Sequence, residues 1–318
     1  MRIVYMGTGE IGLPTLKWLV ENQGSHEVVG VFTQPDKKIG RKQLLTPPEV
    51  KVLAEEAGIP VFQPETLRKN ESAFEELTGL NADLLVVMAY GQILPRTVIE
   101  APSIACVNLH ASLLPRHRGA SPIQAAIRDG DKETGITLMH VVPKLDAGDM
   151  ILKEVLTIDS KDTGGILHDR LAEIGPRTMQ RGLEILSSGE IPAEPQEEDL
   201  VTYAGKLERE HGQIDWSADA EVLERLIRAY DPWPGTYTQL STEEGSKKLK
   251  VYPYAEIGED SEAAPGTILG TQNGLHVSCG SGSLIFRGEL QLEGRRRLSC
   301  GDFLRGTAIP EGTRLGNQ

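Results

Sequence analysis

Cysteine is scarce in this sequence. Three cysteines occur in 318 residues, Cys106, Cys279 and Cys300, and no pair of them has a Cys-x-x-Cys spacing. An odd and scattered set argues against a disulfide framework and against a structural zinc site. None has an evident basic neighbour that would activate its thiol. We therefore expect all three to be packing or surface residues.

The chain also lacks a long apolar run. The longest stretch near its middle, residues 82–89, contains Asp83 and falls far short of the roughly 20 residues that a membrane helix needs. The chain begins directly with a strand-like segment, Arg2–Met6, which leaves no room for a signal or transit peptide. We expect a cytoplasmic protein with no membrane partner.

A surplus of positive charge is absent as well, since the formal net charge is -13. An acidic chain is a poor general partner for nucleic acid, because phosphate binding needs positive charge. Most local basic clusters are merely solvated, but a small basic surface can still take an RNA with salt-sensitive affinity. Three such clusters occur, at Lys37, Lys38, Arg41 and Lys42, at residues 247–250 and at residues 295–297.

What is present is an ordinary soluble composition, 39% hydrophobic and 25% charged, in a chain long enough for about two domains. Up to residue 189, apolar strands alternate with helical stretches, which predicts an α/β domain with a Rossmann-like, mainly parallel sheet. Expected strands lie at Ile3–Met6, Val28–Thr33, Val61–Gln63, Leu84–Ala89 and Ala105–His110, followed by β-like runs at Gly135–Val142 and Met150–Ile158. Expected helices lie at Leu13–Asn22, Glu49–Ala57, Ser72–Leu77, Pro122–Arg128 and Gly165–Leu186, the last interrupted at Gly175-Pro176.

The segment from residue 190 is rich in proline and acid and has no apolar periodicity, which predicts a linker over residues 190–206. Beyond it, a helix at Ala220–Tyr230 precedes short β-like runs separated by glycine-rich turns. This pattern predicts a smaller all-β, OB-like barrel domain over residues 207–318. The runs lie at Thr236–Leu240, Leu249–Glu256, Thr267–Leu269, Leu275–Cys279 and Leu284–Leu292.

Asn108, His110 and Asp146 carry the strongest chemical signal. The first two stand two apart in a strand-forming run, so they point to the same side of a sheet. Asp146 lies in a glycine-flanked turn that can bring a carboxylate beside an imidazole. Amide, imidazole and carboxylate together suit group transfer at a carbonyl carbon. Taken singly, each has a plainer explanation, with His110 satisfied in a core and Asn108 capping a turn.

Gly7, Gly9 and Gly12 match the dinucleotide-binding pattern Gly-x-Gly-x-x-Gly between a strand and a helix. That pattern also needs an acid at the end of the second strand to hold the ribose. Here Asp36 lies beyond Pro35 in a basic loop, and Glu10 at the helix start would repel a pyrophosphate. We favour a tight strand-to-helix turn, with no NAD bound.

The run from Asn108 through Ser112-Leu-Leu-Pro115 to Gly119, followed by Leu145-Asp-Ala-Gly148-Asp149, resembles the signature of the folate-dependent formyltransferases. These enzymes take the formyl group from N10-formyltetrahydrofolate. Other segments are similar to the methionyl-tRNA formyltransferases within that family, at residues 32–36, 52–56, 89–91, 133–137, 214–216 and 228–235. Asp231 departs from the asparagine that the family more often has there.

The resemblance implies transfer of the formyl group to the α-amino group of methionine on the initiator tRNA, without a metal or redox cofactor. It implies that Asn108 and protonated His110 stabilise the oxyanion, and that His110 moves the proton. Asp146 would orient the imidazole and favour its charged form. We expect direct transfer by a monomeric enzyme, with no side chain formylated on the way.

By the same resemblance, two segments border the folate pocket, partly through backbone groups: Ser112, Leu113, Leu114 and Pro115, and Met88, Ala89, Tyr90 and Gly91. The basic loop at residues 36–46 is similar to the family's insertion that enters the acceptor arm of the tRNA. Arg41 would be its key residue, supported by Lys37, Lys38 and Lys42. The C-terminal barrel, with Lys206 and Arg209, would hold the body of the tRNA.

Two other functions stay open from the sequence. A relative that formylates another amine, such as an amino-sugar nucleotide, or that hydrolyses formyl-folate would keep the catalytic trio without needing the basic loop. A dinucleotide-dependent redox protein or sensor would instead use Gly7, Gly9 and Gly12, and would bind a nicotinamide.

Overall fold

The computed structural model describes residues 1–40, 42–242 and 245–316. The chain divides into two compact units. The first comprises Met1–Pro122, Glu133–Thr157 and His168–Ala204, and the second comprises Ile123–Lys132, Ile158–Leu167 and the chain from Gly205 onward. Two short segments that precede residue 168 therefore belong with the C-terminal part of the chain.

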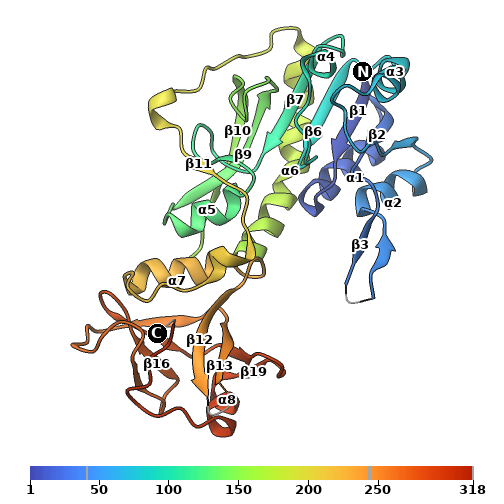
Figure 1. Ribbon diagram of the computed structural model, residues 1–318. Helices are drawn as coiled ribbons and strands as arrows, with labels where there is room; N and C mark the ends of the chain where they lie inside the picture. Colours follow the sequence, from blue (N-terminus) through green and yellow to red (C-terminus); the bar gives the residue numbers. More distant parts are fainter. Residues whose placement is uncertain (41, 243–244, 317–318) are drawn as a thin grey trace. The chain divides into compact units, whose positions relative to one another are not determined.

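The first unit is built on a seven-stranded, mainly parallel sheet (Figure 1). The strand order is β10-β9-β7-β6-β1-β2-β5, and β9 runs antiparallel to both of its neighbours. Every strand expected in this sheet is confirmed. The bounds are β1 Arg2–Gly7, β2 Glu27–Phe32, β5 Val61–Phe62, β6 Leu84–Met88, β7 Ala105–His110, β9 Glu133–His140 and β10 Met150–Thr157.

Both faces of the central strands are buried. In β1, residues 3–6 have no exposed surface, so side chains that point to either face lie in the core. Parallel strands covered by helices on both sides show such continuous apolar runs instead of alternation. The helices of this unit are α1 Leu13–Glu21, α2 Glu49–Glu56, α3 Glu71–Gly79, α4 Arg96–Ile99 and most of α6 Gly164–Ser188.

The expected interruption of the long helix at Gly175-Pro176 is wrong, because α6 continues through Pro176. A proline inside a helix removes one backbone hydrogen bond. Gly175 next to it lets the helix lie close to α1, since a Cβ there would collide with the hydroxyl of buried Thr15. The packing of this face against the sheet domain outweighs the lost hydrogen bond.

The second unit contains two four-stranded antiparallel sheets, in the orders β12-β13-β18-β19 and β14-β17-β16-β15. They enclose a core that includes Trp216, Leu249, Leu284 and Phe286, which confirms the all-β character expected of this part. The strands are β12 Thr236–Thr242, β13 Gly245–Val251, β14 Ala255–Gly258, β15 Ile268–Gly270, β16 Leu275–Ser278, β17 Ser283–Phe286, β18 Glu289–Leu292 and β19 Leu298–Ser299. The helices of this unit are α5 Pro122–Arg128, the expected α7 Ala220–Ala229 and α8 Cys300–Gly306.

Two of the expected β runs are each divided into two strands. The runs at Leu249–Glu256 and Leu284–Leu292 become β13 with β14 and β17 with β18, and the two members of each pair lie in different sheets. The two points of division lie against each other. Gly288, between β17 and β18, lies so close to Pro253, between β13 and β14, that a Cβ on Gly288 would collide with the Pro253 carbonyl oxygen. Strands that bend at such corners join two sheets around one core.

The basic loop at residues 36–46 forms a short hairpin of β3 Lys37–Ile39 and β4 Leu44–Thr46, which projects from the first unit (Figure 1). Lys37, Lys38 and Lys42 are exposed. Arg41 lies outside the described residues. No helix in the described ranges is long and apolar enough to cross a membrane.

Candidate active site

Asn108 and His110 lie at the end of β7, in the middle of the first unit's sheet. β7 pairs with β6 on one side and β9 on the other, opposite Met139 and Thr137. His110 is buried and Asn108 is half-buried. Because they stand two apart on one strand, both side chains lie on the same side of the sheet, as the sequence predicted.

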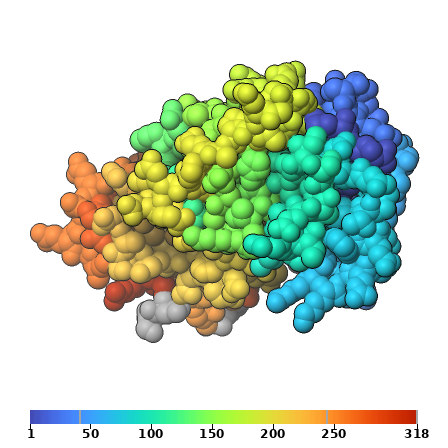
Figure 2. All heavy atoms as spheres, turned by 90° about the horizontal axis from the view of Figure 1, so that it is seen from above, coloured from blue at the N-terminus to red at the C-terminus, as the bar shows by residue number. Residues whose placement is uncertain are grey.

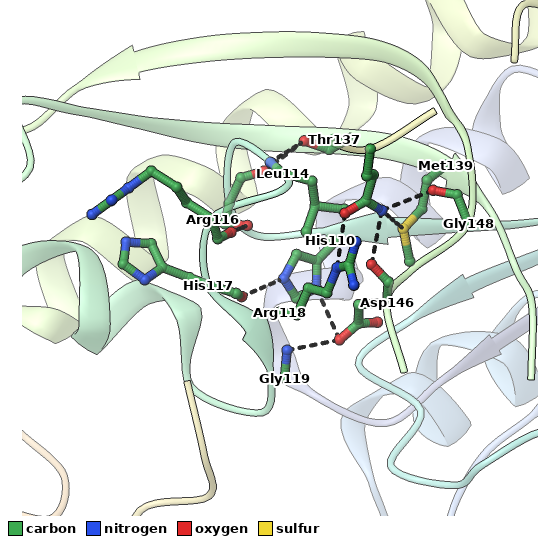
Figure 3. A network of polar contacts seen from close by, with 12 residues as sticks. His110, Leu114, Arg116, His117, Arg118, Gly119, Thr137, Met139, Asp146 and Gly148 are labelled. Atoms are coloured by element: carbon green, nitrogen blue, oxygen red, sulfur yellow. Dashed lines mark hydrogen bonds and ion pairs between the residues drawn. The ribbon is translucent and has the colours of Figure 1, made fainter. Parts of the chain in front are cut away.

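His110 and Asp146 are brought together by the fold (Figure 3). The His110 Nδ1 atom lies 3.8 Å from Oδ2 of Asp146. The other ring nitrogen, Nε2, lies 2.9 Å from the carbonyl oxygen of His117. A carbonyl only accepts, so this network assigns a proton to Nε2. Both ring nitrogens therefore face acceptors, and an imidazole that carries two protons finds a partner at each.

Asp146 is held in place from more than one side. Its Oδ2 accepts a hydrogen bond of 2.8 Å from the backbone N–H of Gly119, at the end of β8 Arg118–Gly119. Its backbone φ is 46°, a left-handed conformation that non-glycine residues rarely adopt. His117 and Ala89 share this property, with φ of 60° and 49°. Such strain persists where surrounding contacts enforce it, and it often accompanies functional sites.

The segment from Ser112 to Pro115 is pinned by Thr137 on β9. The Thr137 hydroxyl donates to the carbonyl of Ser112 at 2.7 Å and accepts from the N–H of Leu114 at 3.1 Å. The Ser112 hydroxyl donates to the carbonyl of Arg116 at 2.7 Å. Leu114 is buried, whereas Leu113 and Pro115 are half-buried. These hydrogen bonds fix the backbone of the segment, which follows His110 closely in the chain. The side chains of Leu113 and Pro115 remain partly exposed.

The residues from Met88 to Gly91 follow β6, the strand next to β7. The Ala89 carbonyl accepts from the N–H groups of Thr8 and Gly9, at 3.2 Å each. The side chain of Tyr90 is buried in a hydrophobic core, and this burial raises the pKa of its hydroxyl. Ala89 and Gly91 are exposed. Any contact of Tyr90 with a ligand would therefore use its backbone.

Gly7, Gly9 and Gly12, which match the dinucleotide-binding pattern, serve the packing of the turn after β1. The amides of Thr8 and Gly9, which would bind a phosphate, are already occupied by the Ala89 carbonyl. A Cβ on Gly12 would collide with the hydroxyl of Tyr5, which donates to the Gly12 carbonyl at 3.0 Å. These glycines permit close packing at a tight turn.

Sequence reasoning missed the polar residues that surround Asp146. Arg118 has no exposed surface, and its guanidinium donates to Gln196 at 2.9 Å and to Glu198 at 3.1 Å. Lys144 and then Arg118 hold the pKa of the Glu198 carboxyl below its usual range through hydrogen bonds. Arg118 stood inside the recognised motif, which was a usable signal. Gln196 lies in an acidic, linker-like stretch, where nothing local marks it.

The three cysteines are all free and buried. Burial raises the pKa of the Cys106 thiol to about 12 and that of Cys279 to about 11. Thiols that stay protonated are poor nucleophiles and poor metal ligands. Within the described residues, no group of three or more His, Cys, Asp or Glu side chains could hold a metal ion.

Comparison with known proteins decides the family. Residues 1–183 match the formyl transferase model, and residues 206–308 match the model of the formyl transferase C-terminal domain. The chain belongs to the formyl transferase family. It is thus a transferase, and its family uses formyl-tetrahydrofolate as the donor.

Formyl transferases of similar length include close relatives of this chain. It is 47% identical to the methionyl-tRNA formyltransferase of Geotalea daltonii, over 100% of this chain and 99% of that protein. It is 46% identical to the methionyl-tRNA formyltransferase of Akkermansia muciniphila, over 96% of each chain. The N-formyltransferase of Helicobacter canadensis, solved in complex with folinic acid and dTDP-3-aminofucose, shares the fold. The two structures superpose with a TM-score of 0.65 at 16% sequence identity. The match covers 89% of this chain and 98% of that one.

Proposed function

We propose that this formyl transferase moves the formyl group of N10-formyltetrahydrofolate to the α-amino group of methionine carried by initiator tRNA. The observation that carries the proposal is the His110–Asp146 pair beside Asn108, in a chain that matches methionyl-tRNA formyltransferases over its full length. The reaction class follows from the site, and the acceptor follows from the relatives.

In the proposed reaction, the free amine attacks the formyl carbon. A bond forms between the amine nitrogen and this carbon, the bond from the carbon to N10 breaks, the amine loses a proton and N10 gains one. The Asn108 amide and the Nδ1–H group of the protonated His110 imidazole donate to the oxyanion that develops. Nδ1 lies 3.8 Å from Asp146, beyond hydrogen-bond length, whereas the Nε2–H group is held by the His117 carbonyl. One such donor is worth roughly 2.7–4 kcal/mol. His110 also relays the proton, while Asp146 and the His117 carbonyl hold its ring in place.

Substrate binding is divided between segments in this proposal. Ser112, Leu113, Leu114 and Pro115 border the folate, together with the backbone of Met88, Ala89, Tyr90 and Gly91. The hairpin residues Lys37, Lys38 and Lys42, with Arg41, contact the acceptor arm of the tRNA. In this proposal, residues 1–189 carry the groups that act on the substrates, residues 190–206 lead on to the C-terminal part, and residues 207–318 contact the body of the tRNA.

The hairpin adds a second kind of contact. Its apolar side chains Ile39, Leu44 and Leu45 are 55%, 63% and 65% exposed, although they lie among lysines. Apolar side chains beside cations suit the unpaired end of a nucleic acid, where bases offer faces for packing and phosphates offer charge. We infer further that the enzyme acts as a monomer in the cytoplasm, where both proposed substrates are available.

The direct test is transfer of radiolabelled formyl from N10-formyltetrahydrofolate to initiator methionyl-tRNA by the purified chain. We expect His110→Ala to lose about 10²–10⁴-fold in rate at saturating tRNA. We expect Arg41→Ala to act mainly through a raised KM for tRNA. If the wild type consumes the folate but leaves the tRNA unformylated, the acceptor is wrong, and small amines or water become the acceptors to test.

A further inference from the structure

Gln196 stands out within an exposed stretch of chain. Across residues 192–200, all of which the structure describes, Gln196 is the one buried side chain. The chain here lies on the surface of the first unit, beside β9 and β10 (yellow and green in Figure 2). Glu194 forms a backbone bridge with Met150 at the start of β10, with hydrogen bonds of 2.8 and 3.0 Å. This bridge sets the register that directs the Gln196 side chain inward.

The side-chain amide of Gln196 binds the turn that carries Asp146. Its Nε2 atom donates to the carbonyl oxygens of Asp146 and Gly148, at 2.8 Å each. Both amide protons are thereby used on one turn. Figure 3 shows the two carbonyls, on the labelled residues Asp146 and Gly148, with the dashed lines that reach them.

Arg118 determines which way this amide points. A guanidinium only donates, and its Nε atom lies 2.9 Å from Oε1 of Gln196. The amide oxygen must therefore face Arg118, which leaves the NH₂ group to face the two carbonyls. Arg118 is followed directly by Gly119, whose N–H binds the Asp146 carboxylate. The same short segment thus holds Asp146 through its carboxylate and, by way of Gln196, through its backbone.

Asp146 needs this support because its backbone is strained. Its φ of 46° is held only if surrounding contacts outweigh the steric cost. The far side of the turn is fixed by β9, where the His140 N–H donates to the carbonyl of Asp149 at 2.9 Å. A Cβ on Gly148 would collide with the carbonyl of His140. Gln196 supplies the corresponding restraint at Asp146 itself.

We propose that Gln196 is a positioning residue for the transfer reaction: it holds Asp146 in the conformation that places its carboxylate beside His110, and Arg118 orients the amide that does so. This rests on the proposed function of the trio. The role concerns catalysis rather than binding, because none of these contacts involves a residue that we assign to the folate or to the tRNA.

The test compares two substitutions with a matched control. Gln196→Met removes both donors while filling the space. Gln196→Glu keeps an acceptor for Arg118 but replaces the donors with a carboxylate that cannot bind the two carbonyls. Glu197→Ala changes the exposed neighbour, whose side chain makes no hydrogen bond or ion pair within the described chain. We expect both Gln196 variants to lose about 10–100-fold in kcat, with KM for both substrates within about twofold of wild type. Glu197→Ala should match wild type.

A double-mutant cycle separates positioning from general damage. In an Asp146→Ala background, Gln196→Met should cause no further loss of kcat, because its effect passes through Asp146. If the two losses multiply, or if Gln196→Glu behaves like wild type, the proposal is overturned.

A spectroscopic readout makes the test independent of the acceptor. The ¹⁵N signals of the His110 ring, assigned by their loss in His110→Ala, should move in Gln196→Met toward their positions in Asp146→Ala, and stay in place in Glu197→Ala. Unmoved signals would overturn the positioning role even if tRNA formylation is confirmed. Moved signals together with an absence of tRNA formylation would retain it and reject the acceptor instead.

Discussion

At the scale of single residues, the candidate site gathers backbone conformations that are costly to hold. Ala89, His117 and Asp146 all have positive φ, at roughly 1–3 kcal/mol each. Each also presents a group to the site region: the Ala89 carbonyl holds the glycine turn, the His117 carbonyl holds His110, and the Asp146 carboxylate faces it. Packing elsewhere in the fold thus offsets the cost of these conformations, two of which, at His117 and Asp146, hold the imidazole of His110.

Asp231 offers a stability prediction at the same scale. Burial raises the pKa of this carboxyl, and Glu289 adds to the effect while Arg297 opposes it. A raised folded-state pKa means that the folded protein disfavours the charged form, so Asp231 lowers stability above that pKa. We expect Asp231→Asn to raise Tm at pH 7 by roughly 1–3 °C. The gain should shrink as the pH falls through the raised pKa towards 4. Thermal melts between pH 4 and 8 check this, and a gain independent of pH would contradict it.

At the scale of elements, helix α6 shows how closely one helix can lie against its neighbours. Gly175 faces Thr15 of α1, and a Cβ on Gly182, seven residues along the same helix face, would lie 2.5 Å from buried Leu138 of β9. Glycine ordinarily weakens a helix by about 1 kcal/mol relative to alanine. Glycine is present at both contacts because the neighbouring side chains leave no room for a Cβ atom.

The sign of the change in the free energy of unfolding on a Gly→Ala substitution therefore shows whether packing or helix propensity dominates at a position. Gly175→Ala should destabilise the protein by about 1–3 kcal/mol, because the new methyl group overlaps the Thr15 hydroxyl. Gly79→Ala, at the end of α3 with open space around the new Cβ, should be neutral or stabilising. Urea unfolding of both variants measures the difference. Equal effects would show that helix propensity, and not packing, decides at Gly175.

At the scale of the whole molecule, the net charge of the chain opposes binding of the proposed acceptor. The chain carries a net charge of -13, yet the proposed acceptor is a polyanion. Binding must then rely on local basic surfaces such as the β3–β4 hairpin, and it should be strongly screened by salt. Binding of the formyl donor, a small molecule, should depend far less on such contacts.

We therefore expect KM for tRNA to rise at least about tenfold between 50 and 200 mM salt, while KM for the formyl donor changes little. Replacing Lys37, Lys38 and Lys42 by Gln should flatten the salt dependence for tRNA, by about 0.7–0.9 in the log–log slope for each lost phosphate contact. Steady-state kinetics over a salt series supply both numbers. An unchanged slope in the triple variant would remove the hairpin from the tRNA contact.

Local patterns predicted most of the elements, and they were wrong where a distant contact intervened. The apolar runs of the seven-stranded sheet predicted its strands, because the central strands are buried on both faces and are therefore apolar almost throughout. The interruption at Pro176 was wrong because packing at Gly175 keeps α6 continuous. The two divided β runs were wrong because Gly288 and Pro253 meet at a corner between sheets, which no single run reveals.

The candidate site divides in the same way. The sequence by itself determined that Asn108 and His110 share one side of a sheet, because a strand repeats every two residues. It also marked Asp146 as a mobile carboxylate within a family signature. Only the tertiary structure decided that Asp146 faces Nδ1 of His110, and that Gln196, 50 residues further along the chain, binds its carbonyl. The first kind of information is local geometry, which the order of residues specifies. The second depends on which distant segments pack together, and that is settled only when the whole domain buries its core.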